Sequence, residues 1–89
     1  MPRFLSVSTV PGMDREKLSK AAHAVRDWRP DPRTTILKVY CSPGQGKVFT
    51  ECDAAKQEDF EAWLKAKGWN WEAIYPIGLV AQTGNIWQL

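Results

Sequence analysis

The chain of 89 residues is 44% hydrophobic and 25% charged, values typical of one globular domain spanning residues 1–89. Its net charge of +2 is too small to indicate a nucleic-acid or anionic membrane partner by itself. No apolar run approaches the ~18 residues that a membrane-spanning helix needs, and the N-terminal residues lead into a strand rather than a signal peptide. We therefore expect a cytoplasmic protein with no membrane partner.

The first predicted element is a strand over Arg3–Val10, whose side chains alternate between two faces. Leu5 and Val7 fall on one face. The other face, which we expect to point away from the helices, carries Phe4, Ser6 and Ser8. Pro11 and Gly12 then end the strand.

A helix is predicted from an N-cap at Asp14 to about Trp28. Its apolar residues recur at intervals of three and four, as a face packed on a sheet requires. These residues are Leu18, Ala21, Ala22, Val25 and Trp28. The only histidine, His23, falls nearly opposite this stripe, so we expect it at the surface or in a subunit contact.

A β-hairpin is predicted over Thr34–Cys52, with residues 42–46 as a turn that contains Pro43 and two glycines. The register that makes both faces chemically consistent gives one mostly apolar face. Its pairs are Cys41 with Val48, Val39 with Thr50 and Leu37 with Cys52. The other face pairs Tyr40 with Phe49 and Lys38 with Glu51, an aromatic pair and an opposite-charge pair.

The two cysteines, Cys41 and Cys52, lie on facing strands in this register, but four residues apart along the ladder. At ~3.3 Å per residue they are separated by about 13 Å, beyond the ~7 Å limit of a disulfide. We therefore expect two free thiols. The sequence also lacks the cysteine and histidine spacing of a zinc site.

A second helix is predicted over about Ala54–Lys67, capped by Asp53. Gly68 stands where a helix ends in a left-handed residue, and Trp69 can then fold back on Leu64 as in a Schellman motif. A last strand is predicted over Glu72–Gln82. The short apolar tail Ile86–Leu89 is expected to return as a hairpin or to dock on a neighbouring subunit.

The order strand, helix, strand, strand, helix, strand predicts an α+β fold of the ferredoxin-like βαββαβ type. Its four-stranded antiparallel sheet has the order 4-1-3-2, with both helices on one face. The uncovered face would then carry Phe4, Ser6, Ser8, Lys38, Tyr40, Phe49 and Glu51. So many exposed aromatic side chains indicate that a second subunit, a ligand or a nucleic acid covers this face.

The run Gly46–Asp53 (GKVFTECD), followed by Trp63, Trp69 and Pro76-Ile77, resembles a known family. It is similar to the short bacterial ferredoxin-like proteins with a domain of unknown function, in the dimeric alpha+beta barrel superfamily. The likeness covers about Trp28 to Ile77. It implies a homodimer whose sheets face one another, but it brings no established activity, cofactor or catalytic residue.

Together these observations predict a homodimer that binds a small molecule between the facing sheets or uses that face only for dimerisation. The candidate ligand-binding residues are Ser6, Lys38, Tyr40, Phe49 and Glu51. The identity of the ligand, assemblies larger than a dimer and exchange of the tail between subunits stay open.

Enzymatic activity also stays open, because the superfamily includes cofactor-independent monooxygenases and isomerases. A related reaction here would use Glu51 as a general base with help from Tyr40 or Ser6. Glu51 can equally serve only as the cross-strand partner of Lys38. The sequence assigns no catalytic residue, cofactor or metal ligand.

Two further alternatives are single-stranded RNA binding and nickel binding. RRM domains share this topology and stack bases on aromatic side chains where Phe4 and Phe49 would lie, but the RRM signature is absent. We therefore do not expect a nucleic-acid partner. Related nickel-binding proteins resemble this chain at His23, but their strand cysteine corresponds to Thr50 here, which disfavours a metal.

Overall fold

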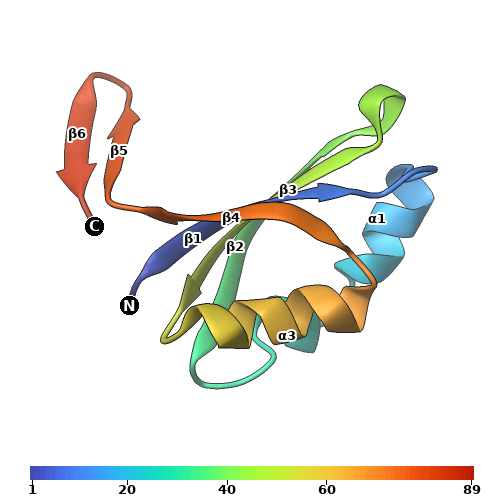
Figure 1. Ribbon diagram of the computed structural model, residues 1–89, viewed down its shortest axis with the longest axis horizontal. Coiled ribbons are helices and arrows are strands. Elements are labelled where there is room, and N and C mark those ends of the chain that lie inside the picture. Colours follow the sequence, from blue (N-terminus) through green and yellow to red (C-terminus); the bar gives the residue numbers. More distant parts are fainter.

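The computed structural model describes residues 1–89, arranged as one sheet, a helical layer and a separate hairpin (Figure 1). In chain order the elements are β1 (Arg3–Thr9), α1 (Arg15–Ala21), α2 (Val25–Trp28), β2 (Thr34–Ser42), a 3-10 turn (Pro43–Gln45), β3 (Lys47–Ala54), α3 (Gln57–Lys67), β4 (Trp71–Ile77), β5 (Leu79–Gln82) and β6 (Asn85–Gln88). None of the helices is both long and apolar enough to span a bilayer.

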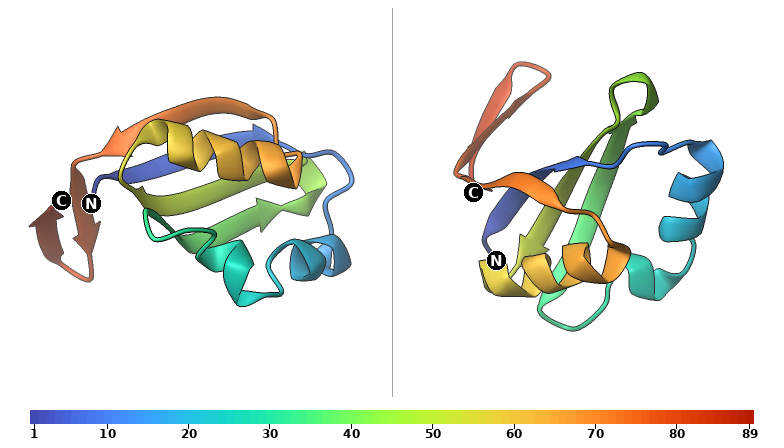
Figure 2. Two further views of the ribbon diagram at one scale, coloured as in Figure 1. Left: turned by 90° about the horizontal axis from the view of Figure 1, so that it is seen from below. Right: turned by 45° about the vertical axis from the view of Figure 1, so that its right-hand side comes forward.

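Strands β1 to β4 form one antiparallel sheet in the order β2-β3-β1-β4. Read from its other edge, this is the order 4-1-3-2 that the sequence predicts. The helices lie along one face of the sheet, while the β5–β6 hairpin rises on the opposite side (Figure 1 and Figure 2). The predicted α+β class with a four-stranded antiparallel sheet is therefore confirmed.

The core lies between the sheet and α3. Every second side chain of β3 from Val48 to Ala54 is fully buried, as expected for a strand covered on one face. From α3, Phe60 and Leu64 are fully buried, and the Phe60 ring lies 6.5 Å from that of Phe4. This packing decides which face of each strand the helices cover.

The predicted orientation of β1 is wrong, because its two faces are exchanged. The residues that point toward the helices are Phe4, Ser6 and Ser8. Leu5 and Val7 lie on the uncovered face, opposite Glu51 and Phe49 of β3. Alternation in β1 does not reveal which side is covered, whereas pairing does, since residues directly opposite one another share a face.

The register of the β2–β3 hairpin follows the prediction for four pairs. These are Cys41 with Val48, Val39 with Thr50, Tyr40 with Phe49 and Lys38 with Glu51. The fifth predicted pair is wrong: Cys52 lies opposite Ile36, not Leu37, because the register shifts between Ile36 and Lys38. Leu37 is thus an extra residue in β2, a β-bulge.

The first predicted helix is broken into α1 and α2. Asp14 caps α1 as expected, accepting a hydrogen bond from the Lys17 N–H (2.8 Å). The helix ends at Ala21, however, because the Asp27 carboxylate accepts the backbone N–H groups of His23 (3.1 Å) and Ala24 (2.8 Å). These bonds offer the backbone an alternative to helical hydrogen bonding, and α2 begins at Val25.

Asp27 also joins α2 to α3. Its carboxylate pairs with the ammonium group of Lys67, which donates a second hydrogen bond to the Ala21 carbonyl (2.7 Å). The Trp63 indole N–H donates to the Asp27 carbonyl (2.8 Å). The side chains of Asp27 and Lys67 are only 18% and 16% exposed, so this joint is held by charge-assisted bonds away from bulk water.

The Asp27–Lys67 pair predicts a pH dependence of stability. The hydrogen bond from Lys67 is the main cause that lowers the pKa of Asp27 from 3.8 to about 2. Ionised Asp27 therefore stabilises the fold above about pH 4, and this contribution is lost as the pH falls toward about 2. We expect Asp27→Asn to lower the Tm near neutral pH and to flatten the acid-side dependence of Tm.

Thermal unfolding followed by circular dichroism across this pH range checks the prediction. Glu58→Gln is the matched control, because Glu58 is exposed and forms no ion pair. The assignment is contradicted if Glu58→Gln flattens the profile as much as Asp27→Asn does.

The start of α3 differs from the prediction. The helix begins at Gln57 rather than at Ala54, and Asp53 is not its cap. Asp53 instead belongs to β3, where its carboxylate accepts a hydrogen bond from Nε of Arg3 (2.9 Å). The Asp53 carboxylate therefore binds Arg3, 50 positions away in the sequence, instead of capping the helix as the local pattern predicts.

The end of α3 is the predicted Schellman motif. Gly68 has φ 74°, in the left-handed region. Its N–H donates to the Lys65 carbonyl and the Trp69 N–H to the Leu64 carbonyl, both at 3.0 Å. The motif turns Trp69 into the core, where its ring meets that of Trp63 edge-on at 5.5 Å.

The predicted last strand is divided in two at Gly78, between β4 and β5. The chain then returns through β6, and the Leu89 N–H donates to the Gly78 carbonyl (2.9 Å) at the base of the hairpin. The tail is therefore a hairpin, one of its two predicted forms. Its apolar side chains are left largely in solvent, namely Leu79, Ile86, Trp87 and Leu89.

Candidate ligand-binding face of the sheet

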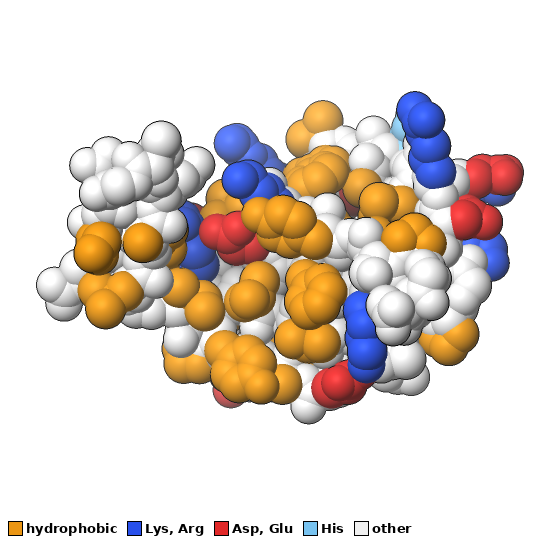
Figure 3. All heavy atoms as spheres, turned by 90° about the horizontal axis from the view of Figure 1, so that it is seen from above, with side chains coloured by type: hydrophobic (Ala, Val, Ile, Leu, Met, Phe, Trp, Pro, Cys, Tyr) orange, Lys and Arg blue, Asp and Glu red, His pale blue; other side chains and the backbone are white.

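The helices leave one face of the sheet uncovered, and we call it the open face. Its larger apolar side chains come from all four strands and include Leu5, Val7, Tyr40, Phe49 and Tyr75. Figure 3 views the molecule from this side and shows apolar atoms gathered over the sheet, with charged groups toward its ends. Phe49 lies at the centre of the cluster, opposite both Val7 and Tyr40.

A charged cluster lies at the end of the open face near the N-terminus. Nε of Arg3 donates to Asp53 at 2.9 Å, and Nη1 of Arg3 lies 3.5 Å from Oε2 of Glu51. The hydrogen bond to Asp53 is the main cause that raises the pKa of Arg3. The guanidinium of Arg3 is thus already neutralised by two carboxylates of its own chain.

A second charged cluster lies at the opposite end of the open face. Lys47 forms an ion pair with Glu72 and donates a hydrogen bond to Oγ1 of Thr9 (2.9 Å), which itself bonds Glu72. The hydrogen bond from Lys47 is the main cause that lowers the pKa of Glu72. This cluster ties the turn end of β3 to β1 and β4.

A hollow of about 570 Å³ lies where the β5–β6 hairpin rises from the sheet. The residues that line it come from β1, β2, β3 and β5. They are Arg3, Leu37, Lys38, Tyr40, Glu51, Val80, Ala81 and Gln82. Half of these residues are apolar and half are polar or charged, so the hollow is more polar than most ligand sites.

The hollow brings together three of the five residues that the sequence nominates, namely Lys38, Tyr40 and Glu51. Phe49 lies next to Tyr40 in the register, on the open face outside the hollow. Ser6 is a wrong nomination: it lies fully buried under the helices, and its hydroxyl has no hydrogen-bond partner. The exchange of faces in β1 removes it from the site.

Arg3, Leu37 and the three residues of β5 are the part of the hollow that sequence reasoning missed. The sequence signal for Arg3 is Asp53, which lies directly opposite it, but this pairing can be recognised only when the β1–β3 register is known. The predicted Lys38–Glu51 pair has the right register, but Glu51 forms its ion pair with Arg3 and no carboxylate pairs with Lys38.

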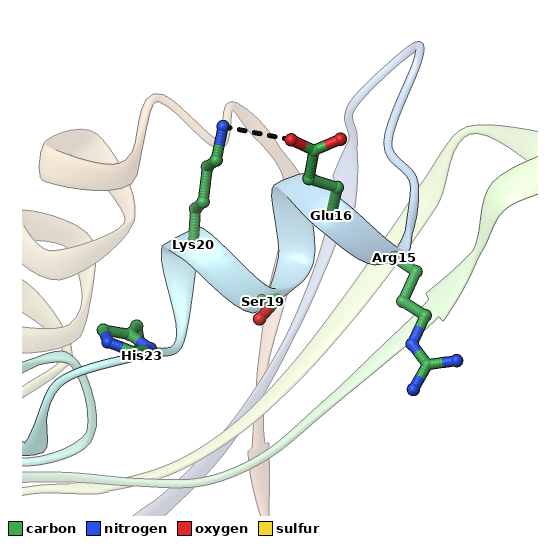
Figure 4. A pocket seen from close by; sticks show the side chains of 5 residues that line it. All are labelled: Arg15, Glu16, Ser19, Lys20 and His23. Carbon is green, nitrogen blue, oxygen red and sulfur yellow. Dashed lines mark ion pairs between the residues drawn. The ribbon is translucent and has the colours of Figure 1, made fainter.

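A larger hollow, of about 670 Å³, lies beside α1 and is lined by Arg15, Glu16, Ser19, Lys20 and His23. Figure 4 shows that these side chains do not converge: Lys20 and Glu16 lean toward one another, and Arg15 extends away from His23. The Lys20–Glu16 ion pair (3.3 Å) is more than three-quarters exposed, so it contributes little. We therefore place the candidate site on the open face.

Metal-ligating and nucleophilic groups do not cluster in the chain. No three side chains of His, Cys, Asp and Glu lie close enough together to hold a metal ion. Cys41 and Cys52 are free, and burial raises the pKa of Cys52 to about 12, which keeps its thiol protonated at neutral pH.

The fold and the open face define a small α+β protein whose sheet is covered by helices on one side only. No protein-family model and no curated protein matches the sequence. Among solved structures, the chain is similar to the crystal structure of SCO4226 from Streptomyces coelicolor A3(2), with a TM-score of 0.75 and 18% sequence identity. The match covers 89% of this chain and 99% of that protein. At this identity the likeness concerns the fold alone.

Proposed function

We propose that the protein is a ferredoxin-like homodimer that binds a small molecule between its two facing sheets. The observation that carries the proposal is the open face, where Tyr40 and Tyr75 expose 48% and 54% of their surface beside other apolar side chains. Contiguous apolar surface of this kind usually marks an interaction site.

A second copy of the same chain suits the open face electrostatically. The face carries three basic side chains, Arg3, Lys38 and Lys47, and three acidic ones, Glu51, Asp53 and Glu72. Its net charge is therefore zero. Two such faces can approach without net repulsion, whereas a nucleic acid needs a positive surface. The exposed apolar side chains of the β5–β6 hairpin, among them Trp87, offer a further contact for the partner.

The hollow under the hairpin supports small-molecule binding. Its volume of about 570 Å³ lies within the ~300–1,000 Å³ of most ligand pockets. In a single chain it opens onto the open face, so the second sheet of the proposed dimer would cover it. Lys38, Tyr40 and Glu51 would then contact the ligand.

Catalysis by Glu51 has less support than binding. The general-base hypothesis requires a carboxylate that can take a proton and a hydroxyl that assists it. One oxygen of Glu51 is held by Arg3 at 3.5 Å, and Ser6 lies on the other face of the sheet.

The RNA and nickel alternatives also have less support. Phe4, one of the two proposed base-stacking residues, is 7% exposed and lies in the core. His23, the residue that suggested nickel, is exposed between α1 and α2, whereas Thr50, which replaces the cysteine of the nickel-binding proteins, is buried beneath the helices.

Native mass spectrometry before and after denaturation tests the proposal. We expect twice the chain mass of 10.1 kDa, with an additional mass that denaturation releases. A bare dimer would contradict the small-molecule part and leave the open face as an interface only. A bare monomer at micromolar concentration would contradict both parts.

A further inference from the structure

We infer that the hollow under the hairpin takes a small molecule with an apolar body and a single anionic group, and that Lys38 holds the anion. The inference rests on the proposed function and names its ligand class. It depends on which charges around the hollow are already paired, and on how a bulge in β2 directs two side chains.

Arg3 is not available to an anionic ligand. Its guanidinium donates to Asp53 through Nε (2.9 Å) and through Nη2 (3.3 Å), and its Nη1 lies 3.5 Å from Glu51. A bidentate pair of this kind has good geometry, and together with Glu51 it compensates the positive charge of the guanidinium with two carboxylates. An anionic ligand at Arg3 would have to compete with both of them.

Lys38 is the cation of the hollow that no carboxylate of the chain neutralises. Its expected partner, Glu51, is directly opposite in the register but is paired with Arg3. An ammonium group of this kind can pair with one anionic group of a ligand without breaking an existing ion pair.

The bulge at Leu37 gives the hollow an apolar and a cationic group side by side. Consecutive residues of a regular strand point to opposite faces, yet both Leu37 and Lys38 line the hollow. The register shift between Ile36 and Lys38 accounts for this, because a bulge redirects the side chains around it. Bulges often occur next to functional sites for this reason.

The remaining lining specifies the rest of the ligand. Leu37, Val80 and the Tyr40 ring provide apolar contacts, and the Tyr40 hydroxyl and Gln82 amide provide neutral polar ones. The carboxylates of Glu51, which lines the hollow, and of Asp53, which pairs with Arg3, oppose a ligand with several negative charges, such as a nucleotide. The lining of the hollow therefore fits a hydrophobic or aromatic molecule with a single acidic group.

Two fluorescent probes with the same ring systems test the inference. Anilinonaphthalene sulfonate carries one negative charge, and phenylnaphthylamine carries none. Each probe is titrated into wild-type protein and into Lys38→Met, Lys38→Arg and Lys56→Met. Lys56 is an exposed lysine at the start of α3 with no ion pair, so Lys56→Met matches the change in net charge.

We expect Lys38→Met to raise the Kd of the sulfonate about tenfold and to change the Kd of the neutral probe less than twofold. Lys38→Arg should retain the sulfonate affinity, and Lys56→Met should leave both probes unaffected. Equal effects of Lys38→Met on both probes, or equal effects of Lys56→Met and Lys38→Met, would overturn the anion assignment but not the binding function. Failure of the wild-type protein to bind either probe would overturn the small-molecule function itself.

Discussion

Phe49→Asp is expected to convert the proposed dimer into a monomer. Phe49 lies at the centre of the open face, between Val7 and Tyr40, where a second copy would bury it. An aspartate there would lose the aromatic contact and place an unpaired charge in a desolvated interface. Truncation at such central positions costs about 2–4 kcal/mol, so the dimer dissociation constant should rise at least about thirtyfold.

Analytical ultracentrifugation across a range of concentrations measures this effect. Val25→Asp is the control, because Val25 is 79% exposed on α2, where the predicted helical stripe would have packed it against the sheet. The control should sediment like the wild-type protein. A Phe49→Asp variant that dimerises with wild-type affinity would show that the open face is not the interface.

Phe4→Ala is expected to lower the free energy of unfolding by about 3–5 kcal/mol, the usual cost of truncating a buried phenylalanine. Phe4 is 7% exposed, and its ring packs 6.5 Å from that of Phe60. The size of the loss should not depend on protein concentration, because Phe4 contacts α3 of its own chain.

Urea denaturation of Phe4→Ala and Leu5→Ala compares the two faces of β1 directly. Leu5 is only half-buried in the single chain and lies on the open face, so its truncation should cost less and should weaken the dimer instead. If Leu5→Ala were the more destabilising of the two in unfolding experiments, the strand would have the orientation that its sequence alone suggests.

The features that the sequence predicts correctly depend on residues close together in the chain. The β2–β3 hairpin is specified by its turn and by the match of Tyr40 with Phe49 and of Lys38 with Glu51. The end of α3 is specified by Gly68, whose left-handed conformation fixes the bonds of the following residue. The order of the elements along the chain, with right-handed crossovers, also suffices to predict the α+β class and the strand order.

The features that the sequence does not predict depend on long-range contacts. Asp27 ends α1 and pairs with Lys67, 40 positions away, and helical periodicity carries no sign of this pair. The local pattern predicts Asp53 as a helix cap, but its carboxylate accepts a hydrogen bond from Arg3 of the neighbouring strand.

The sequence by itself therefore determined most of the elements and four of the five predicted hairpin pairs, because these follow from local geometry and from pairing across one turn. It also predicted three residues that line the hollow, Lys38, Tyr40 and Glu51. The tertiary structure alone decided which face of β1 is buried, which removed Ser6 from the site and brought Leu5 and Val7 onto the open face. It also decided that Arg3 is neutralised by two carboxylates while no carboxylate of the chain pairs with Lys38. The physical reason is that burial and charge pairing depend on neighbours in space, which alternation within a strand does not identify.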